Sequence, residues 1–319
     1  MTEGPTIGQN KAEGESSSAD VITFVDEAGL GGLERNLKLA QDHEIGLMCA
    51  LPIPLEHVEY ARSRVSPFYK MFCAAAPPGA KLHITDAFAP GNDKWRVAAE
   101  AARDGIFAVM HETHLRVVFA ARRGRLAREN HTQFSQLQAE AKRAAQTREP
   151  SKFAVPGRNR PSDKIVLDQV MVDLSLLLDG FMETAERRIS DLYFDQIDSP
   201  LAERYSRMIE RTRNISFRRH EVKARNLETG KDEFRVIEMK AQADFRLNAI
   251  HVGKIVVVGK ADPLVFAVDV TANSLWRHLK TLPAEAPLNA ASSLAAWPLE
   301  PITFYDRRSD APPSILDLV

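Results

Sequence analysis

The stretch VITFVDEAGLGG, Val21–Gly32, carries the features from which the fold can be argued. Its first five residues, Val21–Val25, are mostly β-branched or aromatic and favour a buried strand. The glycine-rich end, Gly29–Gly32, predicts a sharp turn of the backbone. The two residues between these parts, Asp26 and Glu27, are acidic, and carboxylates are rarely buried without a partner. Either Asp26 bonds the amides of the turn, or the strand ends at a functional site.

Composition narrows the class of protein. The chain has 319 residues, of which 44% are hydrophobic, so it can bury one large core or two small ones. Only two cysteines, Cys49 and Cys73, and a polar sequence at residues 1–19 indicate a cytoplasmic protein with a disordered N-terminal tail. No apolar run approaches the roughly 18 residues of a transmembrane helix. We therefore expect a soluble protein without a membrane partner.

Strands and helices are expected to alternate along the chain. In the first half, the patterns predict further strands at Ile45–Leu51, within Ala80–Phe88 and at Leu115–Ala120, and helices at residues 54–68 and 94–110. In the second half, they predict helices at residues 162–181, 199–213 and 262–279, strands at Leu192–Phe194 and Ile255–Val258, and a hairpin that turns at Glu228–Lys231. This alternation indicates an α/β fold.

Three segments fall outside the regular alternation. Residues 122–161 are polar and basic, which predicts a linker or a mobile excursion. Residues 215–250 contain the hairpin and are expected to form an insertion. Residues 283–319 are proline-rich and lack periodicity, so we expect an extended C-terminal tail that wraps the domain or binds a protein partner. The remaining residues between 20 and 282 are expected to form one domain.

Three aspartates share a setting that favours a bound cation. Asp26 and Asp195 each follow a hydrophobic strand, and acids at strand ends can meet at the edge of a sheet where ligands bind. Asp269 lies in an apolar part of the last helix. Converging carboxylates repel one another unless a cation neutralises them, and Mg²⁺ or Mn²⁺ is the usual choice for oxygen ligands. Taken singly, Asp195 could instead precede a helix, and Asp269 could pair with Arg277 or Lys280.

Two further side chains are candidates for a role beside these acids. Glu27 would be a ligand or would orient one. His83 could protonate a leaving group or orient water if it lies near the acids, although a lone histidine in a strand is more often structural. A zinc site is not expected, because His111, His114 and the two cysteines lack ligand spacing.

Basic residues are concentrated in two segments. From Arg122 to Arg160 there are ten Lys or Arg against three acids, and from Arg204 to Arg225 there are eight against two. Such an excess is typical of a surface that binds a polyanion, or of a solvated basic face. The arginines expected to hold a nucleic-acid backbone are Arg122, Arg123, Arg125, Arg158, Arg160, Arg211, Arg213, Arg218 and Arg219. The sequence does not choose between DNA and RNA.

Four short motifs together resemble the domain of unknown function 3800 family. They are Val25–Gly29, Lys81–Asp86, Leu192–Asp195 and Phe266–Val270. The resemblance extends over roughly residues 21–282 and implies a ribonuclease-H-like fold, in which a mixed sheet is flanked by helices, with a metal-dependent nuclease site. The chain departs from the family pattern at Ala28, where serine is usual, at Lys81, where an acid is frequent, and at Val268, where alanine is usual.

The sequence thus predicts metal-dependent phosphodiester hydrolysis. Asp26, Asp195 and Asp269 would hold Mg²⁺ or Mn²⁺, and the basic segments would hold a nucleic-acid backbone without reading its sequence. Analogy with the family suggests work on mobile elements or in defence. The alternative is a subunit that keeps the fold without the chemistry and binds nucleic acid or serves as a scaffold in a larger assembly. Lys81 favours the alternative, whereas the retention of all three aspartates favours hydrolysis.

Overall fold

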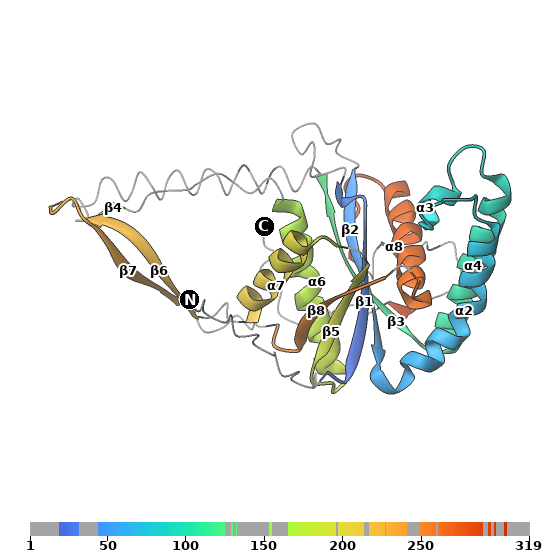
Figure 1. Ribbon diagram of the computed structural model, residues 1–319, viewed down its shortest axis with the longest axis horizontal. Coiled ribbons are helices and arrows are strands. Elements are labelled where there is room, and N and C mark those ends of the chain that lie inside the picture. The colour runs from blue at the N-terminus through green and yellow to red at the C-terminus, as the bar shows by residue number, and fades with distance from the viewer. Residues whose placement is uncertain are drawn as a thin grey trace, which may run out of the picture.

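The computed structural model describes residues 19–31, 44–124, 129, 132, 153–154, 165–195, 197–213, 217–226, 228–240, 249–259, 261–289, 293–294, 297 and 303–304. Within these residues the main body has three layers, a mixed β-sheet with helices on both faces (Figure 1). A second, three-stranded sheet stands apart from the main body. The expected α/β fold with a mixed sheet flanked by helices is confirmed.

The strand expected at the start of the chain, β1 (Val21–Ala28), lies inside the main sheet. The strand order is β8-β5-β1-β2-β3-β9. The other strands are β2 (Ile45–Pro54), β3 (Arg116–Arg123), β5 (Ser190–Asp195), β8 (Val252–Val258) and the two-residue β9 (Thr303–Phe304). Neighbours among β1, β2 and β3 are antiparallel, whereas β5 is parallel to both β1 and β8. The carboxyl ends of β1 and β5 therefore lie next to each other at the same end of the sheet.

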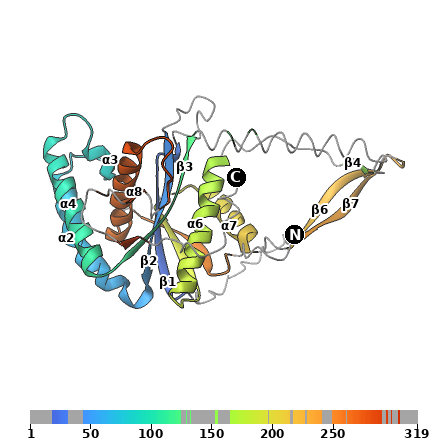
Figure 2. The ribbon, with the colours of Figure 1, turned by 180° about the vertical axis from the view of Figure 1, so that it is seen from behind.

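Helices cover the two faces of this sheet (Figure 2). The helices on one face are α2 (Val58–Ala75), which follows a 3-10 turn at Leu55–His57, the short α3 (Ile84–Ala87), α4 (Asp93–Glu112) and α8 (Pro263–Thr281). The other face carries α6 (Ile165–Thr184) and α7 (Ser199–Arg213). Phe24 packs in the core beneath α8 and Val25 in the core beneath α6. Because side chains alternate along a strand, Asp26 points to the same face as Phe24.

The second sheet contains the expected hairpin. It has the order β4-β6-β7, with β4 (Phe153–Ala154), β6 (Phe217–Asn226) and β7 (Asp232–Lys240). β6 and β7 pair in antiparallel fashion on either side of a turn in which Gly230 has φ of +66°. Figures 1 and 2 both show this sheet at a distance from the helices of the main body, on the side of α6 and α7.

The strand predicted within Ala80–Phe88 was wrong. This segment forms no strand and ends in the helix α3. The backbone of Leu82 has φ of +60°, which lies in the left-handed region and interrupts an extended strand. His83 then returns to an extended conformation at the start of the helix, so its side chain leaves the backbone at a bend.

The start predicted for the basic excursion, residue 122, was too early, because Arg122 and Arg123 are the last residues of β3. Both side chains are buried. Arg122 donates from Nε to Asp173 of α6 at 2.8 Å, and Arg123 donates to the carbonyl oxygens of Pro283 and Ala286 at 2.8 and 3.0 Å. A buried arginine with such partners holds elements together and cannot face a nucleic-acid backbone. These two residues are thus structural.

Some of the C-terminal segment lies against the main body. Besides the two carbonyl groups that bind Arg123, Trp297 packs against Phe107 of α4 with ring centroids 6.0 Å apart, and β9 pairs with β3. The described part of residues 283–319 therefore wraps the domain, one of the two roles expected for it. In the described ranges, no helix combines the length and the apolar character needed to cross a bilayer.

Candidate functional site

Two of the predicted acids lie next to each other at the carboxyl ends of β1 and β5. Val25 of β1 pairs with Phe194 of β5 in parallel register, so the next residues, Asp26 and Asp195, occupy neighbouring strands at the same level, about 4.8 Å apart at the backbone. Phe24 and Tyr193 precede Val25 and Phe194 by one residue. Their rings contact each other on the face of the sheet that α8 covers, with centroids 5.6 Å apart. The period of two along a strand places Asp26 and Asp195 on this same face.

The third acid comes from α8, which packs on β1 and β2. The start of this helix is fixed by Asp262, whose side chain accepts a hydrogen bond from the Leu264 amide at 2.9 Å and pairs with Arg62 of α2 at 2.9 Å. Farther along, the Trp276 indole donates to the carbonyl oxygen of Ile45 at 2.7 Å. Between these two anchors, the helix presents Asp269 toward the end of β1.

Asp26 and Asp269 interact directly. Burial raises the pKa of Asp26 well above its ordinary value, and the neighbouring charge of Asp269, together with a hydrogen bond between the two side chains, raises it further. Glu27 adds to the shift through its charge. Because the two carboxyl groups interact in this way, ionisation of one disfavours ionisation of the other.

Asp195 lies close enough to Tyr69 of α2 for its charge to affect the pKa of the Tyr69 hydroxyl. Burial, a hydrogen bond with Cys73 and the charges of nearby groups, among them Asp195, raise the pKa of Tyr69 on α2 to about 12. Burial and then the charge of Asp26 raise the pKa of the Cys49 thiol, which lies opposite Asp26 on β2. A thiol held neutral in this way is a poor nucleophile.

His83 lies beside Asp269, as the predicted role requires. Its Nδ1 is 3.9 Å from Oδ2 of Asp269, and its side chain is 42% exposed, against 16% for Asp269. The same Oδ2 accepts a hydrogen bond from the backbone amide of Ile84 at 3.0 Å. The bend at Leu82 thus turns both a ring nitrogen and an amide toward one carboxylate. This arrangement gives the site an exposed group that can move a proton and a buried group that orients its partner.

The shifted pKa of Asp26 predicts a pH-dependent stability of the cation-free protein. Above the ordinary carboxyl pKa of 3.8, the unfolded chain releases its proton while folded Asp26 retains one. The free energy of unfolding therefore falls as pH rises toward the folded pKa, by up to about 1.4 kcal/mol per pH unit. Denaturation in the presence of a chelator should show Asp26→Asn gaining stability over the wild type at pH 8 more than at pH 5. An identical gain at both pH values would show that Asp26 is ionised throughout.

Glu27 is not brought to this cluster of acids. Its side chain points to the opposite face of β1, as alternation along the strand requires. There the Tyr205 hydroxyl of α7, which is fully buried, donates to Oε2 of Glu27 at 3.3 Å. Glu27 influences Asp26 through its charge, and its contact with Tyr205 fixes α7 against the end of β1.

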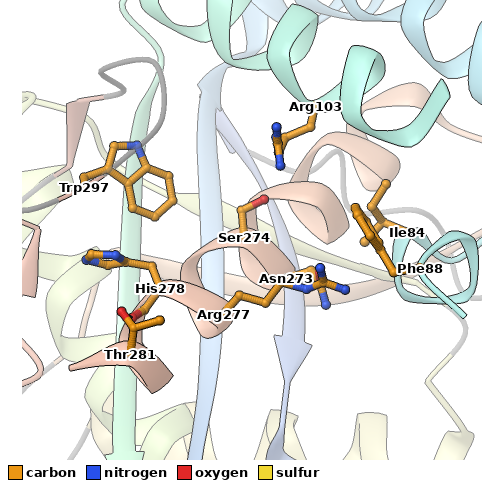
Figure 3. A pocket seen from close by; sticks show the side chains of 9 residues that line it. All are labelled: Ile84, Phe88, Arg103, Asn273, Ser274, Arg277, His278, Thr281 and Trp297. Atoms are coloured by element: carbon orange, nitrogen blue, oxygen red, sulfur yellow. The ribbon is translucent and has the colours of Figure 1, made fainter. Parts of the chain in front are cut away.

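A pocket adjoins the acidic site on α8 and contains side chains that were not expected to be functional (Figure 3). Asn273 and Arg277 follow Asp269 at intervals of four, so the three residues lie along one face of the helix. This spacing of four residues is the feature of the sequence that could have indicated a shared helix face. Arg277 was considered only as a partner for Asp269, but its guanidinium lies over the Phe88 ring, 3.9 Å from the centroid, and Lys280 lies over Trp276.

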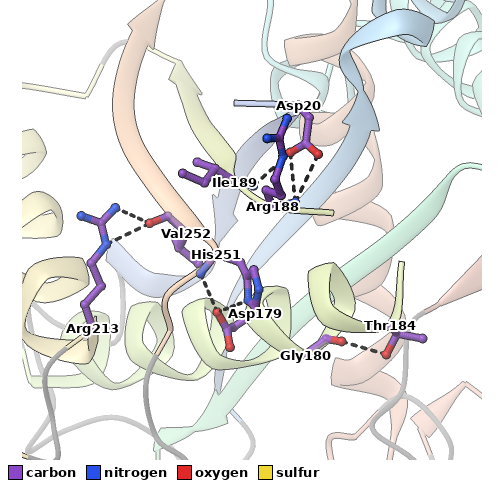
Figure 4. Close-up of polar contacts among 9 residues, drawn as sticks. All are labelled: Asp20, Asp179, Gly180, Thr184, Arg188, Ile189, Arg213, His251 and Val252. Atoms are coloured by element: carbon purple, nitrogen blue, oxygen red, sulfur yellow. Dashed lines mark hydrogen bonds and ion pairs between the residues drawn. The ribbon is translucent and has the colours of Figure 1, made fainter. Parts of the chain in front are cut away.

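The remaining arginines expected to bind nucleic acid either do not line the pocket or lie outside the described residues. Arg213 donates to the carbonyl oxygen of Val252 and so fixes the start of β8 to α7 (Figure 4). At the same end of the sheet, Asp179 accepts from the backbone of His251, as Figure 4 also shows. Arg211 belongs to α7, and Arg218 and Arg219 belong to β6. Arg125, Arg158 and Arg160 lie outside the described residues.

The polar side chains gathered at the end of β1 are mainly carboxyl groups. Within the part of the chain that the structure describes, no three His, Cys, Asp or Glu side chains are arranged as a ready-made metal cage. The site does hold two carboxyl groups that share a hydrogen bond, with a third at the same level on the next strand. Carboxylate oxygens are the ligands that Mg²⁺ and Mn²⁺ prefer. A cation bound between Asp26 and Asp269 would relieve the repulsion between their charges.

Comparisons with models of known protein families, with curated proteins and with solved structures find no match for this chain. The side chains gathered at the end of β1 are therefore the basis for assigning a function.

Proposed function

We propose that the protein is a nuclease that hydrolyses phosphodiester bonds with the help of Mg²⁺ or Mn²⁺, on a ribonuclease-H-like sheet of the kind implied by its resemblance to the domain of unknown function 3800 family. The sheet supports this assignment, because three consecutive antiparallel strands are followed by two parallel strands that place β1 in the middle. The carboxyl pair of Asp26 and Asp269, level with Asp195, is the single observation that carries the proposal.

Each residue of the site has a distinct task in this proposal. Asp26, Asp195 and Asp269 would hold the cation, which would supply positive charge to stabilise the developing charge on a phosphodiester. The Ile84 amide orients Asp269 through its hydrogen bond to Oδ2. His83, exposed and next to Asp269, delivers a proton to the leaving oxygen or removes one from the attacking water. Partial burial of the acids reduces the screening of their charges by water, which strengthens their attraction for a cation.

A Mn²⁺-binding measurement tests the first step without requiring catalysis. Electron paramagnetic resonance should detect Mn²⁺ bound to the wild type, and Mn²⁺ should raise the melting temperature, because a cation that binds only the folded state stabilises it. Asp195→Asn should weaken binding at least about tenfold through the loss of one charged ligand. Cleavage of single-stranded, double-stranded and hybrid substrates with Mg²⁺ or Mn²⁺ tests the second step. Equal Mn²⁺ binding by wild type and Asp195→Asn would overturn the site.

A second candidate is a scaffold or nucleic-acid-binding subunit without catalysis. The sheet β4-β6-β7 favours it, because this sheet stands apart from the main body in Figure 1 and exposes 75% of Phe234. Such a projecting element is suited to contact a partner. Mn²⁺ binding without cleavage of any of the three substrates would support this second function over the first.

A further inference from the structure

The pocket beside the acidic site has walls from three helices and from the C-terminal segment (Figure 3). Its volume is about 240 Å³. The lining residues are Ile84, Phe88, Arg103, Asn273, Ser274, Arg277, His278, Thr281 and Trp297. Aromatic and aliphatic side chains alternate here with hydrogen-bond donors, which is typical of a site for a small organic ligand.

The charge of the pocket is positive. Two of the lining residues, Arg103 and Arg277, are cationic, and none of the lining residues is acidic. Partial burial, followed by the charges of Arg103 and Arg96, lowers the pKa of Arg277. Among the described residues, Arg277 forms no ion pair, although its guanidinium is held in place over the Phe88 ring. A bound anion would relieve the repulsion between these like charges.

The acids closest to these arginines compensate them weakly. Arg103 pairs with its chain neighbour Asp104 at 2.8 Å, and the Asp104 side chain is 64% exposed. Arg96 pairs with Asp93 at 3.7 Å, and the Asp93 side chain is 86% exposed. Ion pairs at such exposed positions contribute little, because water and salt screen them. The arginines therefore retain most of their capacity to bind an anion.

The pocket also offers uncharged donors. Asn273 is only 4% exposed, and its amide forms no hydrogen bond with any described residue. Buried polar groups in folded proteins nearly always have a partner, so an amide at the wall of a pocket is available to a ligand. Together with Arg277, one turn farther along α8, it presents donors that match the oxygens of a phosphate group.

We propose that this pocket binds a nucleotide, with the phosphomonoester held by Arg277, Arg103 and Asn273 and the base packed among Ile84, Phe88 and Trp297. Arginine is suited to phosphate by its planar fork of donors, and stacking on Phe88 fixes the guanidinium before the ligand arrives. Bases gain affinity from contact with aromatic side chains. The binding itself is independent of the proposed cleavage.

Two kinds of ligand would supply this nucleotide. One is a free nucleoside monophosphate, and the other is the phosphorylated end of a nucleic-acid strand. The second source rests on the proposed function. Asp269 and Arg277 are eight residues apart on α8, which corresponds to about 12 Å along the helix axis. A strand whose phosphorylated end lies in the pocket would therefore reach the acids only a short distance from that end, and cleavage would release short products of fixed length.

The experiment measures binding in the presence of a chelator, so that the acidic site makes no contribution through a cation. Adenosine 5′-monophosphate, adenosine and inorganic phosphate are titrated into the full chain by calorimetry. The monophosphate is expected to bind at least about tenfold more tightly than adenosine, because charge-assisted bonds to arginine are lost with the phosphate. Arg277→Gln should abolish this difference. Arg103→Gln should reduce it.

Two control variants distinguish this pocket from the acidic site and from the basic surface at large. Arg116→Gln removes an exposed arginine at the start of β3 and should bind the monophosphate as the wild type does. Asp269→Asn should also retain binding, which distinguishes failure of the acidic site from failure of the pocket. Equal affinities for the monophosphate and adenosine, or an unchanged affinity in folded Arg277→Gln, would overturn the proposal.

Oligonucleotides that differ only in a 5′-phosphate then identify the source of the nucleotide. A strand-end ligand predicts that the 5′-phosphate increases affinity about tenfold in the wild type and not in Arg277→Gln. If only the free monophosphate shows the effect of Arg277, the pocket takes a small-molecule ligand.

Discussion

Replacement of Asp269 by asparagine is expected to reduce cation-dependent phosphodiester cleavage roughly a thousandfold, because a lost ligand charge removes several kcal/mol of transition-state stabilisation. Asparagine has nearly the same shape as aspartate, and its carbonyl oxygen can still accept the hydrogen bond from the Ile84 amide. Initial cleavage rates of wild type and variant at saturating Mn²⁺ measure the effect.

The stability of Asp269→Asn is expected to change in the opposite direction. Without a cation, the charge of Asp269 opposes ionisation of Asp26, so Asp26 retains a proton at a cost to folding, and the raised pKa of Asp26 reflects this repulsion after the larger effect of burial. Removal of one charge should therefore leave the melting temperature in chelator unchanged or higher. A variant that loses cleavage because it unfolds would show a lower melting temperature instead.

A matched control is available on the other face of the sheet. Asp168 of α6 is also partly buried, and it pairs with Arg204 of α7 at 2.6 Å. Asp168→Asn should leave the cleavage rate within about twofold of the wild type, because surface ion pairs contribute only modestly to stability and this one lies on the opposite face of the sheet from Asp26 and Asp269. If Asp168→Asn and Asp269→Asn lose activity to the same degree, the acids at the end of β1 are not the catalytic site.

Replacement of Gly29 by alanine is expected to destabilise the protein by about 3 kcal/mol or more, from backbone strain together with overpacking. Gly29 has φ of +76°, a conformation that residues with a side chain rarely adopt. A methyl group at this position would also collide with the Ile45 carbonyl oxygen and with the Trp276 indole. Those two groups form the hydrogen bond that anchors α8, so cleavage should fall as well.

Gly79→Ala separates the two causes of this effect. Gly79 has φ of +80°, but an added methyl group would have no neighbour within 4 Å. It should cost only the backbone strain, about 1 kcal/mol. Urea denaturation of both variants gives the difference in the free energy of unfolding. Equal losses for Gly29→Ala and Gly79→Ala would mean that the contact of Trp276 with the turn after β1 contributes nothing.

The sequence by itself predicted the elements whose residue pattern is strong. The apolar run Val21–Val25 predicted β1, and Asp262 with the proline after it predicted the start of α8, which the structure confirms. The strand predicted within Ala80–Phe88 was wrong, because the local pattern carries no sign that Leu82 adopts φ of +60°. Arg122 and Arg123 were assigned to a basic surface, because composition does not reveal the partners that bury an arginine.

The amino-acid sequence determined which residues end the strands and which type of side chain stands there, because a strand and its terminal acid are local features of the chain. Only the tertiary structure decided which acids meet. Parallel pairing of β1 with β5 sets Asp26 level with Asp195, and the packing of α8 through Trp276 brings Asp269 to Asp26. Alternation along β1 turns Glu27 away to Tyr205. Such contacts depend on register and on helix packing between residues far apart in the chain, and local pattern contains neither.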